Sequence, residues 1–300
     1  MLRVVITMDG TVMQDKTIDE MIEDIQKKYN IVGRTEELRK CLAAKLANRH
    51  ILLEGDVGVG KTTLAHALAS YFTQDIERVD GDERYSSAKL VGHFDPPMVI
   101  EMGYSWDSFV TGPLTKAMQQ GAILFLNELN RMPEGTQNVL LAAMDEGTII
   151  IPKLGDIKAK EGFFIISAMN PAELVATTPL SEALRDRFVW IRLQYQPEEE
   201  EKNIVSVRTG IKDEKIISIA VKIVRQTRDW PDLRRGASIR GAIDLAAIIR
   251  FLEVNDIESW IDGSIMALAT KIELEDGVES QVEDVIRNIV TSVFKDLDFL

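Results

Sequence analysis

Residues 51–71 read ILLEGDVGVGKTTLAHALASY, and residues 55–62 within them match the pattern G-x-x-x-x-G-K-[ST]. An apolar run, Ile51–Glu54, precedes the match, and apolar residues at helical spacing follow it over Lys61–Tyr71. The glycines permit a turn whose backbone N–H groups point at a phosphate, and the start of the helix adds the positive end of its dipole. A glycine-rich turn without a ligand would rarely satisfy the whole pattern between a strand and a helix. The stretch therefore predicts a phosphate-binding loop at residues 55–62.

The side chains of this loop predict its ligands. We expect the Lys61 ammonium to contact the β- and γ-phosphates of ATP, and the Thr62 hydroxyl to bind Mg²⁺. The remaining contacts would come largely from backbone N–H groups. The predicted nucleotide-binding residues of the loop are Asp56, Val57, Gly58, Val59, Gly60, Lys61, Thr62 and Thr63. The expected cofactors are therefore ATP and Mg²⁺.

Short apolar runs alternate with helical segments through the first two thirds of the chain. After Ile51–Glu54, the predicted strands are Ile76–Val79, Ile123–Asn127, Phe163–Ala168 and Val189–Leu193. Almost unbroken apolar runs are typical of parallel strands that are covered on both faces. Intervening helices such as Thr136–Asp145 indicate βαβ units. We predict an α/β fold, a P-loop NTPase parallel-sheet core (αβα sandwich), followed by a smaller all-α lid domain.

The sequence changes character after Leu193. Gln194–Glu201 reads QYQPEEEE, a polar and acidic stretch that we interpret as a linker that opens a helix. Amphipathic helices are predicted beyond it at Ile216–Gln226, Ser238–Leu252 and Val278–Phe294. We expect an α/β nucleotide-binding domain over 1–195 and a helical domain over 196–300.

The first thirty residues form an N-terminal extension of the α/β domain. Within it, Thr17–Tyr29 reads as an amphipathic helix. Thr17 stands where a helix cap is expected, and Glu20 follows at the spacing of a capping box. We expect this helix to pack against the core.

The composition limits the partners and the compartment. The chain has 300 residues and a formal charge of −13, from 35 Lys and Arg against 48 Asp and Glu. An acidic chain disfavours binding of duplex nucleic acid, which needs a positive field. The single cysteine, Cys41, cannot form an internal disulfide. The first residues break their apolar run too early for a signal peptide, and no apolar stretch is long enough to span a bilayer. A soluble cytoplasmic protein is expected.

A second polar element follows the predicted strand Ile123–Asn127. Enzymes with a phosphate-binding loop place Asp-Glu there, of which the first helps to hold Mg²⁺ and the second orients the attacking water. Here the pair is Asn127-Glu128, so a neutral amide replaces the aspartate. The acidic segment at 79–83, VDGDE, is a rival site that we interpret as a strand-end loop. Whether Asp80 or Asp82 supplies the missing charge stays open.

Several segments together resemble the AAA+ ATPases, and more closely their MoxR-like branch. Residues 127–147 resemble that branch's D-E-I-N-R-x-P…T-Q…L-L-x-A-M-x-E signature, apart from Asn127 in place of the first aspartate. Shorter matches are IVGR at 31–34, GPL at 112–114, AMNP at 168–171, ALRDRF at 183–188 and GASIR at 236–240. The resemblance covers about residues 31 to 250, which excludes the N-terminal extension, residues 1–30.

The resemblance implies a role for each matching residue. Val32 and Gly33 would lie near the adenine, and Arg240 would reach the nucleotide from the helical lid. The implied catalytic residues are Glu128, which polarises the water, Asn170, which positions the water or the γ-phosphate, Arg187, an arginine finger that serves the neighbouring subunit, and Lys61. Thr62 and Asn127 would be the metal-binding residues. Asn127 leads us to expect slow hydrolysis of ATP to ADP and phosphate.

The resemblance also implies a homo-oligomeric, hexameric ring with a chaperone-like role. Such rings remodel a protein partner or a metalloenzyme complex, often with a von Willebrand factor A domain protein. Two other functions stay open: a nucleotide-dependent scaffold that hydrolyses ATP negligibly because of Asn127, and a nucleic-acid-associated motor subunit. The net charge argues against the motor and against nucleic acid as a partner, and no membrane partner is expected.

Two further segments have counterparts in the family. Residues 92–111 are expected to form a loop-rich insertion whose many apolar side chains either bind a partner or fold back on the core. Residues 147–162 are expected to form a β-hairpin with its turn near Gly155-Asp156.

Overall fold

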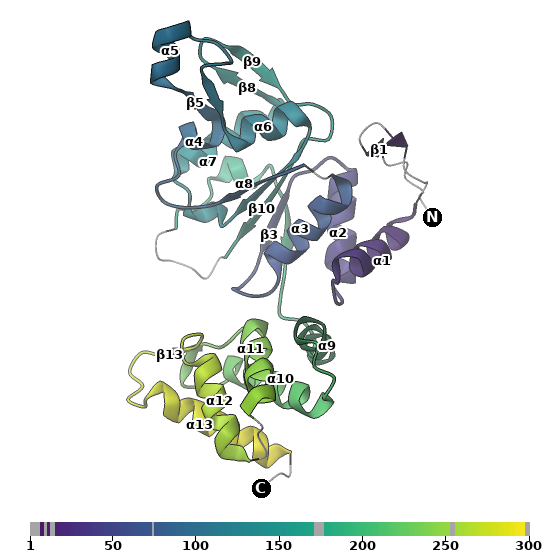
Figure 1. Cartoon of the computed structure of the whole chain (residues 1–300), viewed down its shortest axis with the longest axis vertical. Helices are drawn as coiled ribbons and strands as arrows, with labels where there is room; N and C mark the ends of the chain where they lie inside the picture. Colours follow the sequence, from purple (N-terminus) through teal and green to yellow (C-terminus); the bar gives the residue numbers. More distant parts are fainter. Residues whose placement is uncertain are drawn as a thin grey trace. The chain divides into compact units, whose positions relative to one another are not determined.

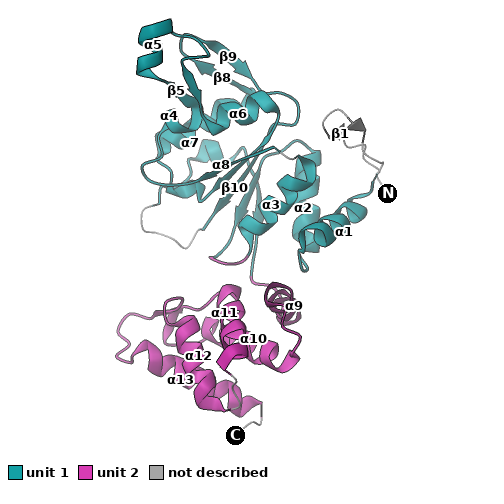
Figure 2. Cartoon of the chain, viewed as in Figure 1, with its two compact units in different colours: residues 1–56, 60–194 teal, residues 57–59, 195–300 magenta. Residues whose placement is uncertain are grey.

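The structure is a computed structural model that describes residues 7–8, 11–12, 16–73, 75–170, 177–252 and 256–297. The chain divides into two compact units (Figure 2). The first unit contains residues 1–56 and 60–194, and the second contains residues 57–59 and 195–300. Among the described residues, no helix is long and apolar enough to cross a membrane.

A five-stranded parallel sheet forms the centre of the first unit (Figure 1). Its strand order is β11-β3-β10-β7-β4, and every neighbouring pair is parallel. The strands are β3 (Ile51–Glu54), β4 (Ile76–Asp80), β7 (Ile123–Asn127), β10 (Phe164–Met169) and β11 (Val189–Arg192). All five predicted strands are confirmed, with ends shifted by at most one residue. Parallel strands place their carboxyl ends at one edge, so the residues after β3, β4, β7 and β10 share that edge.

Helices cover both faces of this sheet, as the predicted αβα arrangement requires. On one face, Leu52, Leu124 and Ile165 belong to one buried cluster with Leu114 of α6 and Leu140 of α7. On the other side α1, α2 and α3 lie together (Figure 1). The helices of this unit are α1 (Ile18–Tyr29), α2 (Thr35–Leu46), α3 (Lys61–Phe72), α4 (Ser87–Val91), α5 (Pro96–Met102), α6 (Pro113–Gln120), α7 (Glu134–Asp145), α8 (Glu182–Arg185) and the 3₁₀ helix η1 (Leu129–Arg131).

The N-terminal helix forms as its sequence predicts. The Thr17 side chain accepts a hydrogen bond from the backbone N–H of Glu20, and the Glu20 carboxylate accepts one from the backbone N–H of Thr17. This reciprocal capping box fixes the start of α1. Met21, Ile22 and Ile25 of α1 are buried, so the helix packs on the unit through its apolar face.

The segment 92–111 is more ordered than the expected loop. It folds as β5 (Gly92–Phe94), α5 and β6 (Phe109–Thr111), and β5 pairs antiparallel with β6. The aromatic rings explain the difference, because Phe94 packs against both Tyr104 and Phe109 and so closes the segment on itself. Ile100 remains 88% exposed, whereas Phe109 is buried. Folding back on the core therefore holds for Phe109, and binding of a partner by the exposed side chains stays a prediction.

The predicted hairpin at 147–162 is present, but its turn lies elsewhere. β8 (Thr148–Ile151) pairs with β9 (Gly155–Lys158), so Gly155 and Asp156 belong to a strand. Residues 152–154 make the turn, in which Lys153 has a positive φ of 73°. The prediction was wrong by about three residues because Gly-Asp was taken for the turn, whereas Gly155 begins the second strand. β1 (Thr7–Met8) also pairs antiparallel with β2 (Thr11–Val12).

The described residues of the second unit form five helices. They are α9 (Glu198–Thr209), α10 (Glu214–Arg228), α11 (Ile239–Leu252), α12 (Ile257–Leu268) and α13 (Val282–Asp296). Their apolar faces form one buried cluster that includes Val221, Leu245, Ile261 and Ile289. The unit is not purely helical, because β12 (Leu233–Arg235) pairs with β13 (Glu273–Leu274). Such short strands lack the apolar runs by which longer ones are recognised.

Candidate functional site

The phosphate-binding loop leads directly from β3 into α3, which begins at Lys61. Gly58 and Gly60 have φ values of +81° and +95°, a region that side chains rarely adopt, so glycine is needed at both positions. Among the described residues, no side chain caps the start of α3. The first N–H groups of a helix have no acceptor within the helix, and a phosphate can accept hydrogen bonds from them. Lys61 Nζ donates to the carbonyl oxygens of Gly55, at 2.5 Å, and Asp56, at 2.8 Å.

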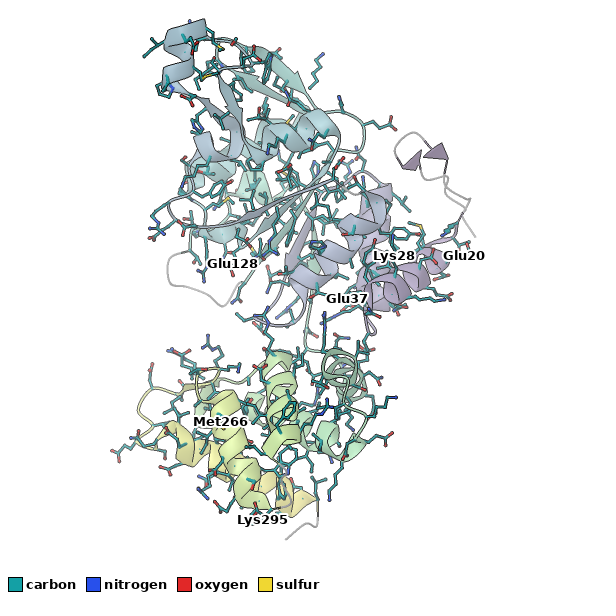
Figure 3. The ribbon with its side chains drawn as sticks, viewed as in Figure 1. Glu20, Lys28, Glu37, Glu128, Met266 and Lys295 are labelled. Carbon is teal, nitrogen blue, oxygen red and sulfur yellow. The ribbon has the colours of Figure 1, made fainter. Side chains whose placement is uncertain are left out.

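The structure brings the two predicted metal-binding residues together. Asn127 ends β7, and its Oδ1 lies 3.4 Å from the Thr62 hydroxyl oxygen at the start of α3. Both atoms are hard oxygen ligands of the kind that Mg²⁺ prefers. Thr62, Asn127 and the partly exposed Glu128 (Figure 3) therefore lie at the carboxyl ends of the strands.

Asp80 was predicted to lie in a strand-end loop. It is instead the last residue of β4 and lies opposite Asn127 in the ladder. The Asn127 side-chain N–H donates to Asp80 Oδ1 at 2.8 Å. Two features of the sequence could have predicted this contact. An amide stands where an aspartate is expected, and a carboxylate stands at the end of another predicted strand. We refer to Asp80, Asn127 and Glu128 as the β4–β7 edge.

Asp80 also forms a bidentate ion pair with Arg78. The Arg78 Nη2 lies 2.8 Å from Oδ1, and its Nε lies 3.2 Å from Oδ2. Hydrogen bonds from Arg78 lower the pKa of Asp80 below its usual value, with a smaller contribution from Asn127 and an opposing one from desolvation. The carboxyl is therefore anionic at neutral pH.

Glu128, the predicted water-polarising residue, adopts an unusual backbone conformation. Its φ of 54° and ψ of 46° place it in the left-handed region, which costs free energy for any residue other than glycine. Its Oε2 lies 3.0 Å from the Nε of Arg131, with both side chains partly exposed. Arg131 thus neutralises part of the charge on the Glu128 carboxylate.

Asn170 lies at the same edge, directly after β10, and is buried. Its backbone oxygen accepts a hydrogen bond from the Asn130 side chain at 3.2 Å. Pro171, which follows it in the resemblance, lies outside the described residues.

Arg187 is held within its own unit. Its guanidinium forms a bidentate pair with Asp145, with distances of 2.6 Å from Nε to Oδ1 and 2.5 Å from Nη2 to Oδ2. It also donates to the carbonyl oxygen of Ala183. The Asp145 carboxylate raises the pKa of Arg187, while the guanidinium lowers that of Asp145. This pair keeps the side chain at the end of α7, the helix that carries Asp145.

The other predicted contacts are spread over both units. Gly33 has a φ of 63°, and its carbonyl oxygen accepts a hydrogen bond from Gln26 at 2.6 Å, next to the half-buried Val32. Thr63 is exposed on α3. Arg240 lies in the first turn of α11 in the second unit and is exposed. The roles of these residues stay predictions.

The donor set suits Mg²⁺ that arrives on a nucleotide. Among the residues described, no three His, Cys, Asp or Glu side chains come together as a metal-binding group. Mg²⁺ keeps several waters and is commonly held by one or two protein oxygens together with substrate phosphates. Thr62 and Asn127 with the anionic Asp80 beside them fit that mode.

The comparisons with known proteins concern the family and the fold. Residues 50–188 match the family model of the AAA domain (dynein-related subfamily). Uncharacterized protein YojN of Bacillus subtilis (strain 168) is 32% identical over 217 residues, which cover 70% of each chain. Uncharacterized protein SH1500 of Staphylococcus haemolyticus (strain JCSC1435) is 32% identical over 213 residues, which cover 69% of this chain and 80% of that protein.

Solved structures share the fold. A Cytophaga hutchinsonii protein described as a candidate ATPase aligns with a TM-score of 0.51 and 21% identity, over 91% of this chain and 94% of that chain. NtrX from Brucella abortus in complex with ADP aligns with a TM-score of 0.52 and 18% identity, over 78% of this chain and 54% of that chain. At these identities the likeness shows the fold, and the family model and the curated relatives show the family. The chain belongs to the AAA+ ATPases, with an AAA domain of the dynein-related subfamily.

Proposed function

We propose that the chain binds ATP with Mg²⁺ and hydrolyses it to ADP and phosphate as a subunit of a homo-oligomeric ring. The observation that carries the proposal is the contact between Thr62 and Asn127, which joins the phosphate-binding loop to the end of β7. Lys61 and Glu128 are their neighbours in the chain. When bound, Mg²⁺ would neutralise charge on the β- and γ-phosphates, held by Thr62 and Asn127.

Each side chain then has a defined task. Lys61 leaves the Gly55 and Asp56 carbonyl oxygens for the phosphates and offsets their charge. Glu128 leaves Arg131 and polarises the water that attacks the γ-phosphorus. Asn170 positions that water or the γ-phosphate. Val32 and Gly33 contact the adenine, and Arg240 completes the nucleotide site from the helical lid.

Arg187 makes the ring a requirement for catalysis. In the isolated chain its guanidinium is paired with Asp145, and assembly would have to release it before it reaches a neighbouring nucleotide. We propose a hexameric ring in the cytoplasm, as in the MoxR-like branch that the motifs resemble. The lid domain is proposed to span 196–300 and the nucleotide-binding domain 1–195.

The ring is proposed to remodel a protein partner or metalloenzyme complex, with a von Willebrand factor A domain protein as the candidate partner. The segment 92–111 supports a protein client, because Ile100, Met102, Tyr104 and Trp106 are exposed on it. Exposed apolar side chains grouped on one segment are costly unless they contact a partner.

Complementation between two inactive variants tests the ATPase and the ring together. Arg187→Ala keeps its own water-polarising residue, and Glu128→Gln keeps its finger. Mixed rings contain some sites with both groups intact, so steady-state phosphate release should recover on mixing. Absence of recovery at every ratio would count against a finger supplied in trans. Capture of proteins by the Glu128→Gln variant with ATP should then identify the client.

One alternative function rests on Asn127. A neutral amide at the metal site favours a nucleotide-dependent scaffold that hydrolyses ATP negligibly. Phosphate release measured with and without excess Mg²⁺ separates the two, because only an enzyme shows turnover that rises with Mg²⁺. The same assay with DNA or RNA tests the motor alternative, which the charge of −13 disfavours.

A further inference from the structure

The β4–β7 edge contains a charge where the sequence motif lacks one. Asn127 contributes only a dipole at the position where an aspartate would carry a full charge toward the metal. Asp80 lies directly opposite it in the ladder, and its Oδ1 accepts the Asn127 side-chain N–H at 2.8 Å. The negative charge therefore lies on the neighbouring strand β4 instead of on β7, and it contacts the Asn127 amide.

This contact decides which way the Asn127 amide faces. The oxygen and nitrogen of an amide have nearly the same shape, so only their hydrogen-bond partners select the orientation. A carboxylate accepts hydrogen bonds and cannot donate them, so the nitrogen must face Asp80. The oxygen then faces Thr62, with 3.4 Å between Oδ1 and the hydroxyl oxygen. This is the orientation that a cation beside Thr62 needs.

The backbone prevents Asp80 from moving away. The N–H of Gly81 donates to the carbonyl oxygen of Asn127 at 2.7 Å. A Cβ at position 81 would lie 2.1 Å from the carbonyl oxygen of Glu128, so only glycine permits this approach. Arg78 also holds the carboxylate, through one hydrogen bond to each of its oxygens. Asp80 is therefore anchored in both its backbone and its side chain.

Asp82, the other acidic candidate, is engaged within its own loop. Its Oδ1 accepts hydrogen bonds from the backbone N–H of Arg84 at 2.8 Å and from the Arg84 Nε at 3.2 Å. Asp82 therefore provides a control carboxylate, two residues from Asp80, for the substitutions below.

We infer that Asp80 is a positioning residue of the Mg²⁺ site: it orients the Asn127 amide and supplies, one strand away, the negative charge that Asn127 lacks. The inference rests on the proposed function, because it assumes that Mg²⁺ and nucleotide bind together at this edge.

The test measures the Mg²⁺ gain, defined as the ratio of the dissociation constants of a non-hydrolysable ATP analogue in EDTA and in saturating Mg²⁺. Asp80→Asn keeps the shape, removes the charge and frees the amide to reverse. We expect the Mg²⁺ gain to fall by about 3- to 30-fold, the effect of one charge near a half-exposed cation site. The dissociation constant in EDTA should stay unchanged. Asp82→Asn is the control and should leave both values unchanged.

An exchange of the two residues gives the sharper result. Asn127→Asp alone sets two carboxylates against each other, where the hydrogen bond now lies, and its Mg²⁺ gain should not exceed that of the parent. The double variant Asp80→Asn/Asn127→Asp restores one amide and one carboxylate, now with the charge facing Thr62. It should show a Mg²⁺ gain at least equal to that of the parent. Circular dichroism would confirm that all variants are folded.

The outcomes separate the inference from the function on which it rests. If Asp80→Asn retains the parental Mg²⁺ gain, Asp80 is only the surface partner of Arg78, and the inference fails while the proposed function stands. If Asn127→Asp alone improves the gain as much as the double variant does, Asp80 has no part in it. If the parent binds no nucleotide even in Mg²⁺, both are overturned.

Discussion

Two carboxylates pair with arginine in opposite surroundings, Asp80 in the first unit and Glu201 in the second. The Asp80 side chain is 58% exposed, whereas that of Glu201 is 2% exposed. Glu201 accepts from two arginines, with Arg225 Nη1 at 2.9 Å and Arg228 Nη1 at 2.8 Å. We refer to these three residues of the second unit as the Glu201 cluster.

The difference in exposure separates a role in ligand binding from a role in stability. An exposed ion pair contributes little to the free energy of unfolding, because water and salt screen it. Removal of one member of a buried pair is costly, because the other charge stays buried without compensation. Substitutions at the nucleotide site should therefore change ligand parameters at nearly constant stability, and substitutions in the Glu201 cluster should do the reverse.

Loss of the loop lysine should have the largest effect on the ligand side. Lys61→Ala should abolish nucleotide binding, because its ammonium is the compact charge that offsets the β- and γ-phosphates. Titration calorimetry with ATP measures this, and Lys158→Ala on the exposed face of β9 is the matched control. Parental affinity in Lys61→Ala would show that residues 55–62 are not the phosphate site.

Removal of the proposed finger should change turnover alone. Arg187→Ala should lower the rate of phosphate release by about 10³- to 10⁵-fold, the range known for arginine fingers, with nucleotide affinity nearly unchanged. The exposed Arg185, two residues earlier, gives the control Arg185→Ala. An equal loss in both variants would point to damage of the α8 region and not to loss of a finger.

The fold could be predicted further than the site. Apolar runs and helical spacing gave all the strands of the central sheet, because burial on both faces leaves a strong pattern. The small pairs β5–β6 and β12–β13 were missed, because they depend on ring contacts and on a partner far along the chain. Asp80 was misjudged for a related reason: the ladder that sets it opposite Asn127 joins residues 47 positions apart.

The sequence also could not predict which residues of the same chain form ion pairs with the predicted catalytic residues. Nothing in the motif shows that Arg131 pairs with Glu128, or that Asp145 pairs with Arg187. A motif names the residue types that chemistry needs. It does not show which charged neighbours hold them when no nucleotide is bound, because long side chains can choose among several partners.

Among these substitutions, those in the Glu201 cluster should lower the free energy of unfolding most. Glu201→Gln removes the charge that compensates the mostly buried Arg228 and the partly exposed Arg225. The expected loss is about 3 kcal/mol in the free energy of unfolding, the lower end of the range for buried pairs. Urea unfolding followed by circular dichroism measures it. ATP affinity of the folded protein should stay close to that of the parent.

Glu199 supplies the matched control on the same helix. Its side chain is 81% exposed and pairs with Lys202. Glu199→Gln should cost about 1 kcal/mol or less. Equal losses in the two variants would mean that burial does not distinguish the two kinds of ion pair, and the comparison with Asp80 would fail.

The smallest expected effect concerns Asp145, whose ion pair is exposed enough to be weak but holds a predicted catalytic residue. Its pair with Arg187 is partly exposed, as at Asp80, yet it holds a residue that must move for catalysis. Asp145→Asn keeps the shape of the side chain and an oxygen acceptor but removes the charge. If release of Arg187 limits assembly of the active site, the variant should raise turnover by about fivefold or less, since an exposed pair is weak. The effect should be largest at low protein concentration, where rings are incomplete.

A change of pH near neutrality cannot break this ion pair in place of the substitution, because Arg187 lowers the pKa of Asp145. The pair is therefore intact at neutral pH and is lost only as the pH falls through that lowered value. Phosphate release as a function of protein concentration is the measurement, with Glu182→Gln on the exposed face of α8 as the control. A fall in turnover in Asp145→Asn at every concentration would reverse the interpretation, because Asp145 would then orient the finger instead of restraining it.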